Sequence, residues 1–191
     1  MDTLINLDHD LFLFINGMHS AFTDMIMWWA SMKLTWIPLY AFLAWFLYKK
    51  FGNKAISLIL FTALLITLSD QGSVLIKNLV MRPRPCHDNS LAFFVHTLND
   101  KCGGKYGFVS SHAANVMALL SYIVIITRNK YKYLTRIMIG YVLLVSYSRI
   151  YLGVHFPSDI VGGWIVGILA ALITLVTYVF ILGIPEEKDR Q

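Results

Sequence analysis

Residues with chemically useful side chains gather at the ends of long apolar segments in three short stretches. They combine cations, histidines, hydroxyls and a carboxylate: Lys77 and Arg84 in the first stretch, Ser110, Ser111 and His112 in the second, and Arg149, His155 and Asp159 in the third. An ionisable residue inside a membrane segment costs roughly 2.5–3.5 kcal/mol on insertion scales, so such residues are usually kept for function. We therefore treat these three stretches as the candidate functional residues.

The third stretch pairs a histidine with a carboxylate at a spacing that suits nucleophilic catalysis. Asp159 follows His155 by four residues and lies early in a helix that Pro157 is suited to begin. A carboxylate held there can bind one imidazole nitrogen, which fixes the tautomer and leaves the other nitrogen free to attack. A purely structural His–Asp pair is the alternative.

The second stretch marks the start of an apolar helix. Ser110 or Ser111 is a natural N-cap, which is the structural interpretation. The free N–H groups and the positive dipole end of a helix start also bind phosphate, and His112 in the first turn would face an anion docked there. Capping explains the serines but not the histidine beside them.

The remaining cations complete a possible anion site. Lys77 and Arg84 alone are weak evidence, because basic residues that leave a membrane helix often extend to lipid headgroups. With Arg149, a helix N-terminus and two histidines, they form a site for a multiply charged anion. Phosphoryl transfer needs mainly positioning and charge stabilisation, so no metal or other cofactor is expected.

Composition predicts the elements that carry these residues. The chain has 191 residues, 57% hydrophobic and 14% charged, and its apolar residues form long blocks, as in a polytopic membrane protein. We expect a single all-α domain, 1–191, with an interfacial helix at 7–18 and an external loop at 82–110. The earliest long apolar stretch is broken near residues 31–33. About five membrane spans are predicted, at residues 34–48, 55–76, 111–127, 134–152 and 159–183. The interfacial helix could instead be half of a sixth span.

Loop charge indicates the orientation. One side of the predicted bundle carries seven basic residues: Lys49, Lys50, Lys54, Arg128, Lys130, Lys132 and Arg136. The other side carries six: Lys77, Arg82, Arg84, Lys101, Lys105 and Arg149. If three of the six are held for function, the count becomes seven against three, which places the first group in the cytoplasm. Basic residues in such clusters are topology signals, and no nucleic-acid partner is expected.

The two cysteines agree with this orientation. Cys86 and Cys102 both lie in the external loop, and a disulfide between them would contribute about 3 kcal/mol by loop entropy. Disulfides persist in oxidising compartments. Two free thiols are the alternative.

These three stretches resemble the motifs of the type-2 phosphatidic acid phosphatase family, whose site is shared with vanadium haloperoxidases. The family's first motif, Lys, six residues, Arg-Pro, matches Lys77 with Arg84-Pro85 and leaves Arg82 as a flanking cation. The third motif, Ser-Arg, five residues, His, three residues, Asp, matches in full from Ser148 to Asp159.

The second motif, Pro-Ser-Gly-His, matches only in part. Ser110 and His112 are present, but Val109 replaces the family proline and Ser111 the family glycine, whose amide contacts phosphate. Ser111 can still donate its N–H.

The resemblance implies a metal-independent two-step reaction. His155 would attack phosphorus to form a phosphohistidine while Asp159 orients it, and His112 would protonate the leaving oxygen and then activate water. The groups implied to hold the phosphoryl oxygens are Lys77, Arg84, Ser110, Ser111 and Arg149.

Several alternatives remain open at this point. A non-catalytic anion transporter or lipid-binding membrane protein would use the same cations. A third possibility is a metal site whose ligands would be His87, Asp88, His96, His112 and His155. This site is disfavoured because the zinc-binding pattern His-Glu-x-x-His is absent from the sequence. The substrate could be undecaprenyl diphosphate, phosphatidylglycerophosphate, phosphatidic acid or lipid A, in a bacterial inner membrane with the site facing the periplasm or exterior. The oligomeric state cannot be predicted.

Overall fold

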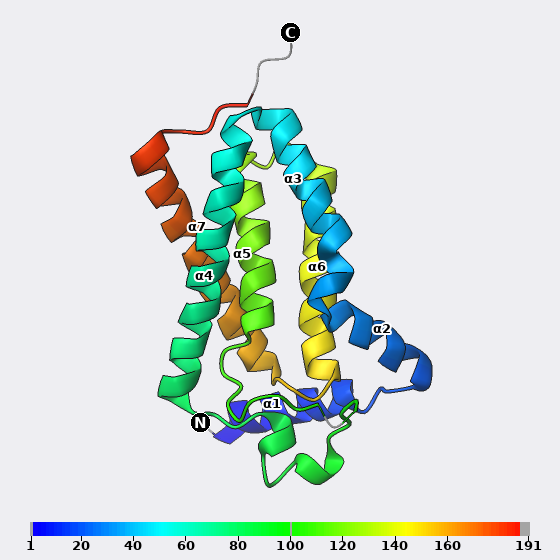
Figure 1. The fold of residues 1–191 in the computed structure, drawn as a ribbon. Helices are drawn as coiled ribbons and strands as arrows, with labels where there is room; N and C mark the ends of the chain where they lie inside the picture. Colours follow the sequence, from blue (N-terminus) through cyan, green and yellow to red (C-terminus); the bar gives the residue numbers. More distant parts are fainter. Residues whose placement is uncertain (1, 100, 188–191) are drawn as a thin grey trace.

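The computed structural model describes residues 2–99 and 101–187. Within these ranges the regular structure is helical. The exception is one isolated β-bridge between Pro83 and Tyr106, and no β-strand is formed within the described ranges. The helices in chain order are α1 (Asp2–Asn16), α2 (Ala21–Ser31), η1 (Lys33–Trp36), α3 (Ile37–Phe51), α4 (Lys54–Val80), η2 (Pro85–His87), η3 (Ala92–Phe94), α5 (Ser111–Ile126), α6 (Lys132–Tyr151) and α7 (Pro157–Leu182). The prediction of an all-α bundle is confirmed (Figure 1).

The helices differ in how well they suit a bilayer. By length and composition, α4 and α7 can each cross a membrane. A third crossing results if α2 and the η1–α3 segment, which meet at a bend of 70°, are counted as one broken span. This bend lies at the break expected near residues 31–33. The apolar helix α5 is shorter, with 16 residues, and α6 carries Arg136 and Arg149 within its 20.

Helix α5 lies at the centre of the bundle and packs most extensively on α7. Gly163 and Gly167 on α7 permit this close approach: a Cβ at Gly163 would lie 2.6 Å from the carbonyl oxygen of Ser110. Small residues four apart are typical of tightly packed membrane helices. The contact brings the start of α5 against the start of α7, where Ser110 N–H donates to the Asp159 carbonyl at 2.9 Å.

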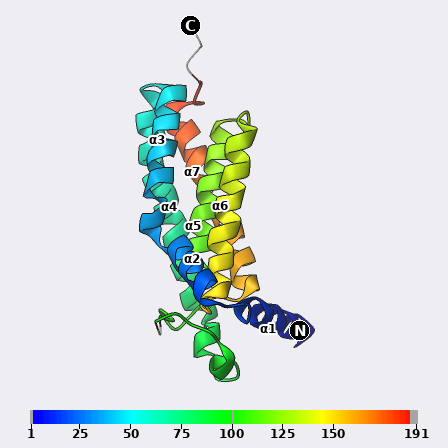
Figure 2. The ribbon, with the colours of Figure 1, turned by 90° about the vertical axis from the view of Figure 1, so that its right-hand side faces the viewer.

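Helix α1 lies at one end of the bundle, which it crosses in the view of Figure 1 and beside which it projects in Figure 2. It occupies 2–16, so the predicted range of 7–18 was set too late. The apolar residues alone suggest a shorter helix, but the polar Asp8 and Asn16 also belong to it and form its inward face with Phe12, at a spacing of four. The exposed side of α1 is an apolar stripe: Leu4, Leu7, Leu11 and Phe14.

Candidate active site

His155 and Asp159 form a buried pair at the start of α7. The Asp159 Oδ2 atom lies 3.2 Å from His155 Nδ1 and also accepts the Phe156 N–H at 3.0 Å. His155 is 2% exposed and Asp159 is fully buried. Asp159 therefore caps the helix that Pro157 begins, and the same carboxylate oxygen meets the imidazole.

The other oxygen of this carboxylate has a partner that the sequence argument left aside. Arg82 Nη1 donates to Asp159 Oδ1 at 3.2 Å and to the Ser158 hydroxyl at 2.6 Å. Its guanidinium carbon lies 4.0 Å from the centre of the Phe156 ring. Arg82 thus holds the carboxylate that faces His155, and it is not merely a flanking cation.

Asp8 on α1 joins the same network. Its carboxylate accepts from Arg82 Nη2 at 2.7 Å, from the Ser158 N–H at 2.9 Å and from the Ser158 hydroxyl at 2.5 Å. Asp8 was missed because it lies 150 residues from Ser158 and belongs to no motif. The only signal in the sequence was an acidic residue on the helix predicted to lie along the interface.

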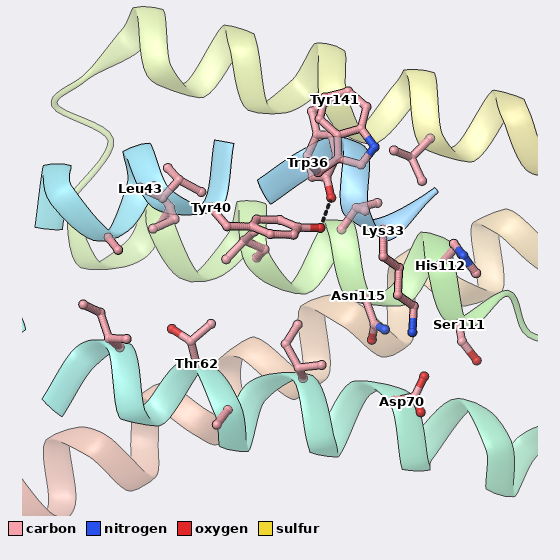
Figure 3. Close-up of a pocket in the computed structure, with 18 of the residues that line it drawn as sticks. Lys33, Trp36, Tyr40, Leu43, Thr62, Asp70, Ser111, His112, Asn115 and Tyr141 are labelled. Carbon is pink, nitrogen blue, oxygen red and sulfur yellow. Dashed lines mark hydrogen bonds between the residues drawn. The ribbon is translucent and has the colours of Figure 1, made fainter. Parts of the chain in front are cut away.

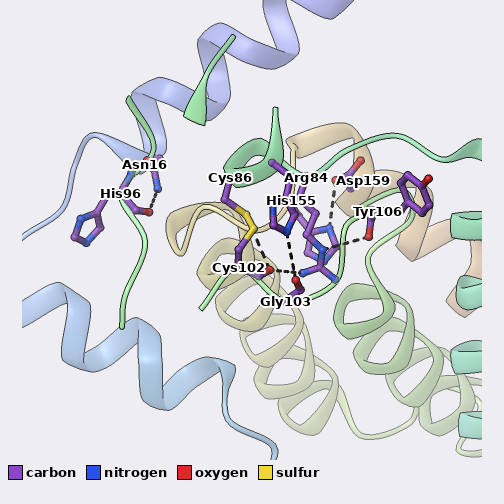
Figure 4. The surroundings of a disulfide bond; sticks show 10 residues. Asn16, Arg84, Cys86, His96, Cys102, Gly103, Tyr106, His155 and Asp159 are labelled. Carbon is purple, nitrogen blue, oxygen red and sulfur yellow. Dashed lines mark hydrogen bonds and ion pairs between the residues drawn. A yellow bond between two sulfur atoms is a disulfide. The ribbon is translucent and has the colours of Figure 1, made fainter. Parts of the chain in front are cut away.

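Arg84 is held near the pair by the loop of residues 82–110 (Figure 4). Its guanidinium donates to the carbonyls of Tyr106 at 3.2 Å and Cys102 at 3.0 Å. Gly107 lies between Arg84 and Asp159, in close contact with both. A Cβ at Gly107 would lie 2.9 Å from Asp159 Oδ2 and 3.3 Å from Arg84 Cγ. Only glycine permits this approach.

A disulfide braces this loop. Cys86 and Cys102 are joined, with 6.0 Å between their Cα atoms. Because the Cys102 carbonyl accepts from Arg84, the disulfide also fixes one of the groups that position this cation.

Two further cations approach from α4 and α6. Lys77 Nζ donates to Ser111 Oγ at 2.5 Å. Arg149 Nη1 donates to the Ser31 hydroxyl, while its Nε is buried and has no hydrogen-bond partner among the described residues, 2–99 and 101–187. Lys77 and Arg149 both lie within electrostatic range of His155. Arg84 lies within the same range, so three cations act on His155.

The start of α5 supplies the remaining predicted groups. Ser110 is the N-cap, and its fully buried hydroxyl accepts the Ala113 N–H at 3.5 Å. Ser111 and His112 follow in the first turn, and His112 lies within electrostatic range of Arg149, His155 and Arg84. The structure therefore brings the eight predicted site residues to one end of the bundle.

The surroundings of His155 favour its neutral form. Burial, followed by the positive charges of Arg149, Arg84 and Lys77, lowers the pKa of its imidazole well below the ordinary value. A neutral imidazole whose Nδ1 faces a carboxylate can use its other nitrogen as a nucleophile.

The other candidate ligands of a metal are dispersed. In the part of the chain that the structure describes, no three His, Cys, Asp or Glu side chains are grouped so as to hold a metal ion. His96 instead lies 3.0 Å from Asp24 and stacks on His19. His87 faces the Gly103 carbonyl at 3.3 Å.

A large apolar pocket opens beside Ser111 and His112. It has a volume of about 690 Å³ and runs between α3, α4, α5 and α6. Figure 3 shows that polar side chains collect at the end near His112, whereas Leu43 and Thr62 lie farther along.

Comparison with known proteins adds independent information. The model of the PAP2 superfamily matches residues 51–181. The lipid A 4'-phosphatase of Bacteroides thetaiotaomicron is 36% identical over 170 residues, which cover 87% of this chain and 75% of that protein. The lipid A 4'-phosphatase of Porphyromonas gingivalis is 34% identical over 182 residues, covering 94% and 76%. The crystal structure of Aquifex aeolicus LpxE matches with a TM-score of 0.68 and 25% identity, covering 89% of this chain and 95% of that one.

Proposed function

The chain belongs to the PAP2 superfamily and is a membrane phosphatase of that family, and we propose that it transfers the phosphate of a lipid to His155 and then to water. One observation carries the assignment of the nucleophile: His155 is buried, and its Nδ1 lies 3.2 Å from Asp159 Oδ2. Burial and the charges of Arg149, Arg84 and Lys77 lower the pKa of its imidazole, which favours the neutral form. This arrangement leaves Nε2 as the attacking atom.

In the first step Nε2 of His155 forms a bond to phosphorus as the bond from phosphorus to the lipid oxygen breaks. His112 gives its proton to that oxygen, so the lipid leaves as an alcohol. In the second step His112 takes a proton from water, the water oxygen attacks phosphorus, and the bond to Nε2 breaks. Asp159 holds Nδ1 through both steps and stabilises the charge that develops on the imidazole.

The phosphoryl oxygens are assigned to five groups: Lys77, Arg84, Ser110, Ser111 and Arg149. Arg84 is anchored by two loop carbonyls, and Lys77 by the Ser111 hydroxyl, so both are positioned before substrate binds. Preorganised donors of this kind stabilise charge without reorganisation during the reaction. The positive end of α5 adds to them.

We assign the chain about five crossings and place the site at the outer face of a bacterial inner membrane. α3, α4, α5, α6 and α7 form the crossings, and the exposed apolar stripe of α1 supports a position along the interface. The seven basic residues counted above lie at the opposite end from the disulfide, which supports a cytoplasmic location for that end.

The substrate that the relatives favour is a phosphomonoester of lipid A. Two curated proteins of that activity match along more than four-fifths of this chain. Phosphatidic acid, phosphatidylglycerophosphate and undecaprenyl diphosphate present a phosphoryl group at a similar depth and are the comparison substrates.

Phosphate release from purified protein in the presence of EDTA tests this function. Wild type is expected to release phosphate from a lipid A 4'-phosphate, and His155→Ala is expected to release none while eluting as a folded protein. Orthovanadate, which mimics the pentacoordinate transition state, should inhibit. Full turnover by His155→Ala would remove the proposed nucleophile.

A further inference from the structure

The pocket beside His112 contains a carboxylate for which the phosphatase reaction has no use. Asp70 lies on α4 and lines the pocket, together with Lys33 of η1 and Asn115 of α5. Among the residues that the structure describes, neither Asp70 nor Lys33 makes an ion pair. The Asn115 Oδ1 atom is buried and accepts no hydrogen bond within the part of the chain that the structure describes.

These three residues form a layer just below the phosphate-binding residues. Asp70 precedes Lys77 by seven residues, so it lies on the same face of α4 and about 10 Å farther along the helix. Asn115 follows His112 by three residues, about 5 Å farther along α5. Figure 3 shows Lys33, Asn115 and Asp70 converging at this end of the pocket, with Ser111 and His112 beside them.

The layer has a definite hydrogen-bonding character. A carboxylate accepts only, and the free oxygen of Asn115 also accepts, so both need a donor from the ligand. The Lys33 ammonium needs an acceptor. Within the layer itself one negative and one positive charge balance, which favours a neutral group that both donates and accepts.

We infer that Asp70, Asn115 and Lys33 form a subsite for the amide and hydroxyl groups of an acylated amino-sugar lipid, whose phosphate is then held at His155. An amide or hydroxyl offers an N–H or O–H to the two acceptors and an oxygen to Lys33. A glycerol ester offers acceptors only, and a polyprenyl chain offers neither, so each leaves Asp70 and Asn115 unpaired in an apolar pocket. This inference rests on the proposed function and names the substrate class that the site prefers.

Single-residue variants test the subsite through a ratio. The full-length protein in detergent is assayed on a tetraacylated glucosamine disaccharide 4'-phosphate and on phosphatidic acid, and kcat/KM is determined for each. Asp70→Leu is expected to lower the ratio of the first kcat/KM to the second by about ten-fold or more. Asp70→Asn keeps a carbonyl acceptor and is expected to lower it by only a few-fold.

Thr67→Val is the matched control. Thr67 is also on α4 but exposed, and its hydroxyl bonds to the carbonyl of Ala63 on its own helix. The substitution should leave the ratio unchanged. If Asp70→Leu fails to fold, Asp70→Asn and Asn115→Leu are measured in its place. The ratio of the two kcat/KM values should fall in both of these variants.

The outcomes separate the two proposals. If wild type hydrolyses phosphatidic acid and the amino-sugar lipid with equal kcat/KM, or if Asp70→Leu lowers both equally, the subsite is wrong and the phosphatase assignment stands. If wild type hydrolyses no lipid, the proposed function is wrong.

Discussion

Arg82 and His155 occupy opposite oxygens of the Asp159 carboxylate: Arg82 Nη1 donates to Oδ1 at 3.2 Å, and His155 Nδ1 lies 3.2 Å from Oδ2. Since Arg82 also binds Asp8, the orientation of the proposed nucleophile is linked to the N-terminal helix.

Loss of this link should impair turnover more than binding. We expect Arg82→Ala to lower kcat by about ten- to a hundred-fold, equivalent to about 1.4–2.7 kcal/mol, because Asp159 loses a charged partner in a buried site. KM should change by no more than a few-fold, since Arg82 is not among the phosphate-binding groups. Steady-state phosphate release gives both constants, and a change confined to KM would contradict this role.

Asp8 should act through Arg82. Asp8→Asn is expected to lower kcat about ten-fold, and Asp8→Glu to restore most of it. Asp10→Asn is the control, because Asp10 is exposed on the other side of the same helix turn. Equal effects of the Asp8→Asn and Asp10→Asn substitutions on kcat would show that only the charge of α1 matters.

His112 should matter most when the leaving group is poor. With a lipid or sugar phosphate, His112→Ala is expected to lower kcat by about 10²–10⁴-fold, the usual contribution of general acid catalysis. With p-nitrophenyl phosphate the first step needs no proton, so the rate of p-nitrophenol release in a single turnover should fall far less. An equal loss on both substrates would assign His112 to binding instead.

The nucleophile should remain active in acid. Because the pKa of His155 is lowered well below 6.5, kcat/KM should decline only at a pH well under that value. Acid should also lower the free energy of unfolding. The unfolded chain binds a proton at this histidine near pH 6.5 and the folded protein does not, so a lower pH favours unfolding. A pH profile of kcat/KM measured from about pH 4.5 to 8 checks this, and an acidic limb centred at 6.5 or above would refute it.

The disulfide should stabilise both the fold and the position of Arg84. Cys86→Ala with Cys102→Ala is expected to cost about 3 kcal/mol of stability and to lower Tm. KM should rise in the same variant, because the loop that holds Arg84 gains freedom. Thermal unfolding in detergent and the KM for the lipid substrate measure the two effects. An unchanged KM would show that the helices alone position Arg84.

Most of the bundle could be predicted from the sequence, and the reasons are physical. Long apolar blocks between basic residues determine α4 and α7, and Ser110 and Pro157 mark helix starts that the structure has at the same positions. The break after Ser31 follows from a short polar interruption in an apolar run.

The supporting network could not be predicted in the same way. Spacing alone selects Arg84 for the phosphate but cannot show that Arg82, two residues earlier, lies against Asp159. Asp8 comes from a helix far away in the sequence, so only tertiary structure reveals its contact with Ser158. Asp70 did carry a signal, because it is a carboxylate inside a long apolar helix, but it belongs to none of the three motif stretches.

The most direct test of the central claim is to trap the covalent intermediate. After rapid mixing with a lipid carrying labelled phosphate and quenching in alkaline denaturant, the protein should carry label that is stable to base and lost in acid, and peptide mass analysis should place it on His155. His155→Ala should carry none. Label on another residue, or full turnover with no labelled protein at any mixing time, would contradict the account.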